Sequence, residues 1–228
     1  MTFEELQKAF SLDEGTIEKL RIYAKLLKEW NEKINLTSIV EEEEVVEKHI
    51  YDSLLPCKVF KFTNQNLIDM GTGAGFPGLV LAICFPELHV TLLDATKKKF
   101  SFLEEVVKQT ETKNVTFLCA RAEDLRTFRE HYDMVTARGF SALQNIIELG
   151  VPLLKVDGTL LAYKGDKGME ELRESERALR LLRTRFSNAQ KEELPGGAGM
   201  RINLFFKKQE KTMARYPRPW NQISKHSL

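Results

Sequence analysis

One stretch of ten residues carries the pattern best suited to binding a ligand, DMGTGAGFPG from Asp69 to Gly78. Residues 66–70, which lead into this stretch, predict a short buried strand, and residues 77–84, which begin at its end, predict a helix. A strand, a glycine turn and a helix form the first half of a nucleotide-binding βαβ unit. The glycines at 71, 73, 75 and 78 carry no Cβ, so a ligand could lie directly on the main chain.

Two classes of ligand suit such a turn. Gly73, Gly75 and Gly78 satisfy the dinucleotide pattern GxGxxG, which would make the protein an NAD-dependent oxidoreductase. Asp69 followed by GTGAG instead resembles motif I of S-adenosylmethionine-dependent methyltransferases, whose ligand has no pyrophosphate. In a dinucleotide site Asp69 would face the pyrophosphate, and the chain supplies no second large domain for a hydride acceptor. We therefore favour the methyltransferase interpretation, with Asp69, Gly71, Gly73 and Gly75 on the cofactor.

Two further charged residues follow predicted strands. Asp94 ends the run 89–95, about 20 positions after the glycines, where a carboxylate could accept the two hydroxyl protons of a ribose. It could equally cap the helix expected from Lys97. Arg138 directly follows the run 132–137, and its guanidinium could hold a base edge, a phosphate or a carboxylate. His49 and Asp52, three residues apart on an expected helix, are more typical of a structural pair.

Strands and helices alternate through most of the chain. Strands are expected at 66–70, 89–95, 114–119, 132–137, 158–163 and 200–207, and helices at 16–30, 41–55, 77–84, 97–110, 141–154 and 169–185. This order predicts an α/β fold with a doubly wound, mostly parallel sheet of the Rossmann-like methyltransferase type and an N-terminal helical extension. We expect an extension over 1–60, a methyltransferase domain over 61–208 and a basic arm over 209–228.

Charge is distributed unevenly although the formal net charge of the 228 residues is only +1. Residues 1–50 carry seven Lys and Arg against twelve Asp and Glu, whereas residues 201–228 carry seven against one. No apolar run is long enough to cross a membrane, and the charged start does not resemble a signal peptide. The three widely spaced cysteines offer neither a disulfide framework nor a metal site. We expect a cytoplasmic monomer without a metal.

Several segments together resemble one family, the bacterial small-subunit ribosomal RNA guanine-N7 methyltransferases, also described as glucose-inhibited division protein B. They are LLKEWNEKINLTSI, HIYDSLL, DMGTGAGFPG, RAEDL, TARGF and AYKG, and they cover nearly the whole chain. The segments WNEKINLTSI and HIYDSLL make the match specific, because motif I alone indicates only a methyltransferase. The chain departs from the family in its last residues, with Pro219, Trp220 and Asn221 where a Lys-Pro-Gly stretch is usual.

The resemblance implies an activity and a set of residues. The cofactor would be S-adenosylmethionine, the product S-adenosylhomocysteine, and the substrate a guanine of 16S ribosomal RNA or the small ribosomal subunit. Gly71 and Phe76 would contact the cofactor, Ala122 and Glu123 would flank its adenine, and Arg138 would lie where cofactor and substrate meet. Guanine N7 has a lone pair and no proton to remove, so positioning and electrostatics would suffice, with Arg138 as the catalytic candidate.

The C-terminal arm is the expected RNA contact, although its composition suits a solvated, partly disordered tail nearly as well. Its cations could bind phosphates, and Tyr216 and Trp220 could stack on bases. The basic residues proposed for RNA are Lys164, Lys207, Lys208, Arg215 and Arg218, with Lys211 and Lys225 also in the arm. A non-catalytic RNA-binding scaffold is a third interpretation, which the intact glycines and Asp94 disfavour.

Overall fold

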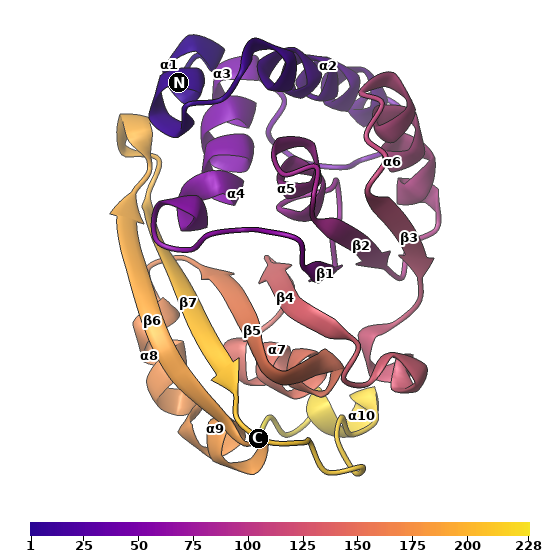
Figure 1. Cartoon of the computed structure of the whole chain (residues 1–228), viewed down its shortest axis with the longest axis vertical. Coiled ribbons are helices and arrows are strands. Elements are labelled where there is room, and N and C mark those ends of the chain that lie inside the picture. The colour runs from indigo at the N-terminus through magenta and orange to yellow at the C-terminus, as the bar shows by residue number, and fades with distance from the viewer.

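The computed structural model describes residues 1–228 and shows a seven-stranded sheet between two layers of helices (Figure 1). The strand order is β3-β2-β1-β4-β5-β7-β6, and β7 alone runs opposite to the other six strands. The expected doubly wound, mostly parallel sheet is confirmed. The strands are β1 (Asn66–Met70), β2 (His89–Asp94), β3 (Val115–Cys119), β4 (Tyr132–Arg138), β5 (Leu154–Lys164), β6 (Thr184–Glu193) and β7 (Met200–Lys208).

Each face of the sheet has its own hydrophobic core. The N-terminal helices share one core of 34 buried residues with α5 and α6, and they lie beside these two helices at the top of Figure 1. This layer holds α1 (Phe3–Phe10), α2 (Glu14–Asn31), α3 (Glu42–Val45), the π-helical turn η1 (Val46–Tyr51), α4 (Asp52–Leu54), η2 (Leu55–Lys58), α5 (Gly78–Cys84) and α6 (Lys98–Gln109). The opposite core of 25 buried residues lies under α7 (Leu143–Gly150), η5 (Val151–Leu153), α8 (Gly168–Glu174), α9 (Glu176–Leu181) and α10 (Trp220–Ile223).

The N-terminal helices are tied to the glycine turn. Asp13 caps α2 by accepting a hydrogen bond from the N–H of Thr16 at 3.0 Å, and Ile17, Leu20 and other apolar residues on one face of the helix are buried. Tyr23 on the same face donates its hydroxyl proton to the carbonyl of Ala74 inside the turn. Residues before the sheet therefore help to fix the shape of the glycine turn.

The order in which strands are added to the sheet reverses between β1 and β4. The chain moves outward from β1 to β2 and β3, then returns to place β4 on the other side of β1. The register pairs Asp69 with Thr136 and Met70 with Ala137, so both strands end at the same level. In open α/β sheets ligands bind at the carboxyl ends of the strands at this point. The topology thus indicates where the site should lie.

Two parts of the fold differ from the sequence expectations. The helix expected over 169–185 ends at Leu181, is divided at Ser175 into α8 and α9, and is followed by the unpredicted strand β6. Most residues of this strand at the edge of the sheet are partly or fully exposed, so it lacks the alternating apolar pattern of a half-buried strand. Helix α1 was also not predicted; it begins with a capping box between Thr2 and Glu5.

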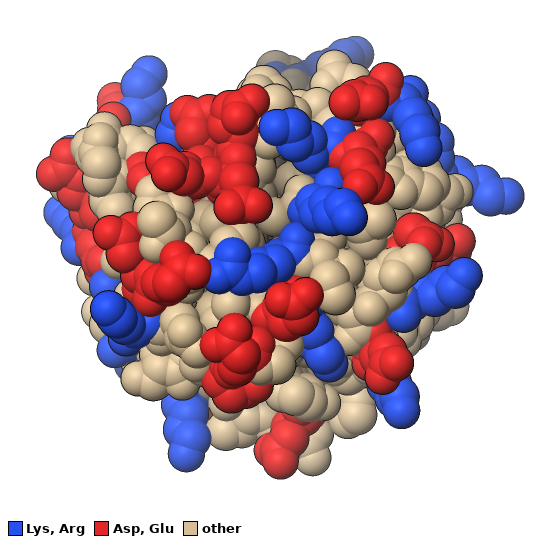
Figure 2. Space-filling model, turned by 90° about the horizontal axis from the view of Figure 1, so that it is seen from above, with Lys and Arg blue, Asp and Glu red and all other residues tan.

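The surface over the N-terminal helices is mixed in charge. Figure 2, which looks down on the top of Figure 1, shows acidic groups interspersed with basic side chains there. The excess of acidic residues over residues 1–50 contributes to this pattern. No continuous basic surface covers this face, so it is a poor candidate for broad contact with a phosphate backbone.

Candidate functional site

The glycine turn after β1 is fixed by hydrogen bonds to the neighbouring strand. The N–H groups of Gly71 and Thr72 both donate to the carbonyl of Leu93 at 2.9 Å. Gly71 has a φ of +71°, and Gly75 a φ of +98°, which favours glycine at both positions. A Cβ on Gly75 would lie 2.4 Å from the hydroxyl of Tyr23, so this glycine faces the protein interior. The turn therefore exposes main chain on one side and packs tightly on the other.

Asp69 stabilises this turn from inside the protein. Its side chain is fully buried, with Oδ2 accepting from the N–H of Gly78 at 3.0 Å and Oδ1 from the hydroxyl of Thr136 at 2.8 Å. Burial raises the pKa of Asp69, although these hydrogen bonds oppose the rise. Asp69 was predicted to contact a cofactor, and in the structure its carboxylate binds the start of α5 and Thr136 of β4.

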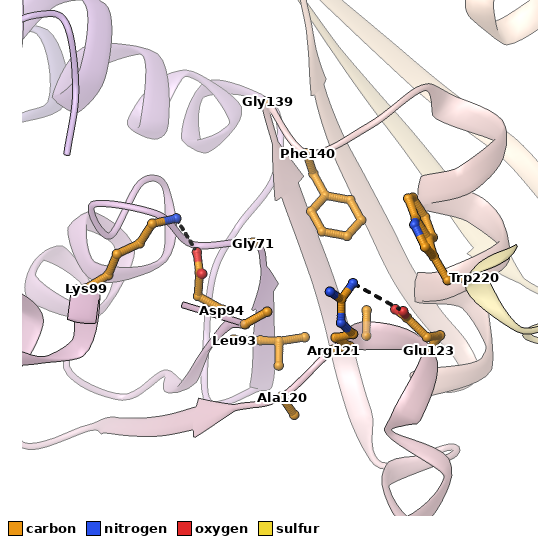
Figure 3. A pocket seen from close by; sticks show the side chains of 12 residues that line it. Gly71, Leu93, Asp94, Lys99, Ala120, Arg121, Glu123, Gly139, Phe140 and Trp220 are labelled. Carbon is orange, nitrogen blue, oxygen red and sulfur yellow. Dashed lines mark hydrogen bonds and ion pairs between the residues drawn. The ribbon is translucent and has the colours of Figure 1, made fainter. Parts of the chain in front are cut away.

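A pocket of about 320 Å³ opens at the carboxyl ends of the strands (Figure 3). Its size is in the range of small-molecule sites. Four predicted cofactor residues line it, namely Gly71, Asp94, Ala122 and Glu123. The other lining residues are Leu93, Ala95, Lys99, Ala120, Arg121, Gly139, Phe140 and Trp220. We call this hollow the first pocket.

Asp94 contributes a fixed carboxylate to the first pocket. Its Oδ2 accepts from the N–H of Gly73 at 3.1 Å and from Lys99 Nζ at 2.9 Å, while Oδ1 accepts from the N–H of Thr96 at 2.8 Å. Burial opposes ionisation, but the hydrogen bonds from Lys99 and Thr96 outweigh it, so the pKa of Asp94 lies below its usual value. The side chain is thus charged at neutral pH. Asp94 therefore caps the following turn and also lines the pocket.

The first pocket has two distinct sides. Figure 3 shows Asp94 and Lys99 on one side, and Phe140 and Trp220 beside one another on the other. Glu123, on the short helix η3 (Ala122–Asp124), lies below Trp220, and its carboxylate is 3.8 Å from Arg121 Nη1. Charged acceptors and aromatic rings therefore converge on one cavity, as a ligand with a sugar and a planar base requires.

Phe76 lies beneath the pocket and does not line it. Its ring is 5% exposed and stacks between Tyr23, at 5.1 Å between centroids, and His49, at 4.6 Å. Gly73 points its N–H at Asp94, and Gly75 packs on the core. Phe76 and Gly75 support the pocket from within the core, whereas Gly73 keeps part of its surface exposed and is placed by its hydrogen bond to Asp94.

Arg138 faces away from the first pocket, toward the N-terminal helices. Its Nη1 donates to Asp52 Oδ2 at 2.9 Å, and its guanidinium lies 5.2 Å from the centroid of Phe76. The same nitrogen lies 3.4 and 3.3 Å from the carbonyls of Lys48 and His49 in the π-helical turn η1. Such turns are frequent at functional sites. Arg138 was predicted as a cofactor contact, and the structure places it instead on an adjoining hollow.

His49 is held neutral beside Arg138. Burial, and then the charge of Arg138, lower the pKa of His49 from 6.5 to about 3. Nδ1 lies 3.3 Å from Nη2 of Arg138, which can only donate, so Nδ1 accepts and Nε2 carries the proton toward Thr37 Oγ1 at 2.9 Å. The sequence suggested His49 and Asp52 as a structural pair, and in the structure each of them contacts Arg138.

The second pocket, of about 410 Å³, is lined largely by charged groups around this cluster. Its walls include Lys48, His49, Asp52, Arg138, Tyr163, Lys164, Glu171 and Arg201, together with Ile39, Gly139 and Gly165. Gly139 lines both pockets, has a φ of +60°, and would direct a Cβ into open space. The two pockets therefore meet at a residue with no side chain.

Several residues that line the two pockets were not identified as such from the sequence. Phe140 and Trp220 line the first pocket, and Arg201 lies 3.1 Å from Asp52 Oδ1 in the second. Gly139 and Phe140 belong to the TARGF segment, and their place directly after a strand end was an available signal. Trp220 was considered for stacking on RNA bases, but no local pattern placed it or Arg201 at these pockets, because their approach depends on the path of the last 30 residues.

Two of the lysines proposed for RNA lie at the opposite end of the sheet. Lys208 is fully buried, donates to the carbonyl of Leu154 at 2.7 Å, and lies 3.4 Å from Glu130. Lys207 pairs in register with Thr159 at the start of the buried part of β5, and donates to the carbonyl of Asp157 at 3.0 Å. Both lysines lie far from the two pockets, and Lys208 is held inside the protein, whereas Lys207 is partly exposed.

The remaining proposed RNA residues have different environments. Lys164 lines the second pocket, 2.7 Å from Glu171. Arg215 is exposed, with its guanidinium over the ring of Tyr216. Arg218 is paired with the fully buried Glu148, through Nη2 to Oε2 at 2.6 Å and Nε to Oε1 at 2.7 Å. Arg218 is therefore paired within the protein, and its RNA contact stays a prediction. The arm itself is packed on the fold.

The structure contains no cluster of three side chains suited to a metal ion. None of its helices combines the length and the apolar character that crossing a bilayer requires.

Comparison of the sequence with known proteins identifies close relatives. The family model described as rRNA small subunit methyltransferase G matches residues 16–194. A protein of that name from Mycoplasma capricolum subsp. capricolum is 41% identical over 220 residues, which are 96% of this chain and 95% of the relative. Another from Mesoplasma florum is 44% identical over 211 residues, which are 92% and 89% of the two chains.

Comparison of the structure with solved structures identifies the same fold. The structure of M. jannaschii TYW2 in complex with AdoMet aligns with a TM-score of 0.57 and 16% identity, over 75% of this chain and 79% of that one. A predicted O-methyltransferase from Agrobacterium tumefaciens aligns with a TM-score of 0.56 and 17% identity, over 71% and 82%. At these identities the likeness concerns the fold alone.

Proposed function

The chain belongs to the rRNA small subunit methyltransferase G family, and we propose that it transfers a methyl group from S-adenosylmethionine to N7 of a guanine in 16S ribosomal RNA. The observation that carries this proposal is the pair of pockets that meet at Gly139. One has the groups that bind a nucleoside cofactor, and the other is polar and large enough for a base. S-Adenosylhomocysteine would be the product.

The first pocket suits S-adenosylmethionine, which supplies a methyl group on a sulfonium. The main chain of Gly71 would lie near the amino-acid end, and the ring of Phe140 fills the place that a Cβ on this glycine would take. The ionised carboxylate of Asp94 would accept from the ribose hydroxyls. Ala122 and Glu123 would flank the adenine, with the carboxylate of Glu123 placed to accept from the exocyclic amine. These assignments use the four predicted residues that line the pocket.

The second pocket suits the target nucleotide. Lys48, Lys164 and Arg201 provide positive charge for phosphate oxygens, and the aromatic ring of Tyr163 lines the same wall. Asp52 and Glu171 are both engaged by cations, so the pocket does not present a free carboxylate as a base. A planar base could enter as far as Gly139, whose missing side chain leaves the passage to the first pocket open.

The chemistry of the second pocket supports a reaction without proton removal. His49 would be the obvious general base, yet its pKa of about 3 and its hydrogen bond with Arg138 make it a weak proton acceptor. Guanine N7 already has a lone pair, so its methylation needs only alignment and a suitable field. We propose that Arg138, held by Asp52 and His49, contacts the substrate at the wall of the second pocket.

Cofactor binding can be tested by calorimetry on the purified protein. S-Adenosylhomocysteine should bind and NADH should not, and the reverse result would support the oxidoreductase alternative. Asp94→Asn keeps an acceptor for the N–H of Thr96 but loses the charge, so it should weaken S-adenosylhomocysteine binding roughly tenfold, as expected for a charge-assisted hydrogen bond. An unchanged dissociation constant would remove Asp94 from the site.

The target can be tested by methyl transfer to small subunits and to naked 16S RNA. The product should carry a label from the cofactor methyl group at one guanine. N7-methylguanine is sensitive to borohydride reduction followed by aniline cleavage of the strand, which maps the position. Label at an exocyclic amine or on a pyrimidine would contradict the proposed reaction while leaving the cofactor assignment intact.

A further inference from the structure

Trp220 occupies a position that the proposed function does not explain. It is the first residue of α10, in the C-terminal segment that the sequence suggested as an RNA arm. In the structure it lines the first pocket beside Glu123 and Phe140, although these residues lie far from it in the chain (Figure 3). Its side chain remains 37% exposed, which is unusual for a large aromatic residue.

The position of Trp220 is fixed by its neighbours in the chain. Arg218, two residues earlier, is bound to the fully buried Glu148 of α7 through three hydrogen bonds from its main-chain and side-chain nitrogens. Ile223, three residues later, is completely buried in the core beneath the same helix. The indole is thus held at the pocket by two anchors, one on each side, and is not a freely moving end.

An aromatic ring at this place in the first pocket could contact a bound base. Asp94 and Lys99 lie on the side that would hold the ribose, while Glu123 and Trp220 lie on the other. An adenine flanked by Ala122 and Glu123 would therefore extend toward the indole. Flat aromatic surfaces attract one another, and a base has a planar face available for this contact.

We propose that Trp220 packs against the adenosine part of bound S-adenosylmethionine, so that the C-terminal segment is part of the cofactor site. This proposal rests on the proposed function, because it assumes that the first pocket binds the cofactor. It assigns the segment to cofactor binding instead of to stacking on RNA.

The contact can be measured by calorimetry with S-adenosylhomocysteine and with adenosine. Trp220→Ala should weaken both ligands about tenfold, because stacking of about 1.4 kcal/mol is lost from the part they share. Trp220→Phe keeps a flat ring and should retain most of the affinity. Trp30→Phe is the matched control, since Trp30 packs on Phe102 and does not line the pocket. A thermal melt of each variant checks folding.

A second measurement uses the two tryptophans of the chain. In the Trp30→Phe variant Trp220 is the only tryptophan, so S-adenosylhomocysteine should change its emission. In the Trp220→Phe variant, where Trp30 alone remains, the same ligand should leave the emission unchanged. Saturation of the signal should give the dissociation constant found by calorimetry.

The results separate the inference from the proposed function. If the unaltered protein fails to bind S-adenosylhomocysteine, the cofactor assignment itself is wrong. If it binds, but Trp220→Ala binds both ligands equally well and the emission of Trp220 is unaffected, only the role of Trp220 is overturned. Unchanged cofactor binding with weakened RNA binding would return Trp220 to the RNA contact that the sequence suggested.

Discussion

The guanidinium of Arg138 donates to the carboxylate of Asp52 across 2.9 Å, from the end of β4 to the helices that precede the sheet. Both side chains are mostly covered, with 15% and 4% of their surfaces exposed. Arg201 Nε lies 3.1 Å from the second carboxylate oxygen, without the alignment of a hydrogen bond. Asp52 therefore neutralises two arginines at the wall of the second pocket, and the N-terminal helices become part of the site.

Replacing Asp52 tests this arrangement. Asp52→Asn should lower the free energy of unfolding by about 3 kcal/mol, because it leaves two partly buried guanidinium groups without a counter-charge. Denaturation in urea measures this loss. Methyl transfer should fall while the affinity for S-adenosylhomocysteine stays within about twofold, since Asp52 does not line the first pocket.

Glu41→Gln is the control for this change. It also converts a carboxylate to an amide in an ion pair, here with Lys28 at 3.8 Å, but both side chains are more than half exposed. Its effect on stability should be under about 0.5 kcal/mol. Equal losses in the two variants would show that the Asp52 cluster has no special energetic importance.

His49 should make stability depend on pH. Its pKa is about 3 in the folded protein and near 6.5 in the unfolded chain, so the unfolded state binds the extra proton between these values. Stability must then rise with pH across this window. Lowering the pH from 7 to 5 should cost about 2 kcal/mol through His49. Urea denaturation of His49→Gln at both pH values should lack this part of the loss, whereas His89→Gln, at an exposed strand end, should retain it.

Gly139 should be intolerant of a side chain for a functional reason. Its φ of +60° makes Gly139→Ala costly by about 1 kcal/mol in stability. The added methyl group would also stand where the two pockets meet, so methyl transfer should drop roughly tenfold or more. Gly197→Ala is a matched control, because Gly197 has a φ of +71°, equally open surroundings and no place in either pocket. Comparable activities in two variants of equal stability would refute the passage at Gly139.

The sequence was most informative where local pattern and position coincide. The glycine turn, the strand before it and Asp94 could be located because a buried parallel strand produces a continuous apolar run and a functional residue follows its end. The family segments added Ala122 and Glu123, which the structure places in the first pocket. The direction in which each side chain points was not available from the pattern, and for this reason Asp69 and Phe76 were placed on the ligand side.

Contacts between distant segments were beyond sequence reasoning. Arg138 was singled out, but its partners lie more than 80 residues away on a helical segment that the sequence suggested only as a structural pair. Composition alone suggested that the last 20 residues form a basic arm. Burial of Tyr216 and Ile223, and the pairing of Arg218, depend on a complementary surface on the opposite face of the sheet that no local pattern reveals.

Arg218 provides the clearest separation of a structural from an RNA-binding cation. Glu148 is completely buried, so Arg218→Ala should cost about 3–5 kcal/mol by leaving its charge without a partner. Adding Glu148→Gln to this variant should recover part of the loss, because the buried charge is removed. Arg215→Ala, at an exposed position of the same segment, should change stability by under about 0.5 kcal/mol.

The salt dependence of RNA binding should show the opposite order of effects. Arg215→Ala should reduce the slope of log affinity against log salt concentration by about one if Arg215 meets a phosphate. Arg218→Ala should leave this slope unchanged wherever the variant remains folded. A reduced slope in a folded Arg218 variant would show that this arginine contacts RNA after all.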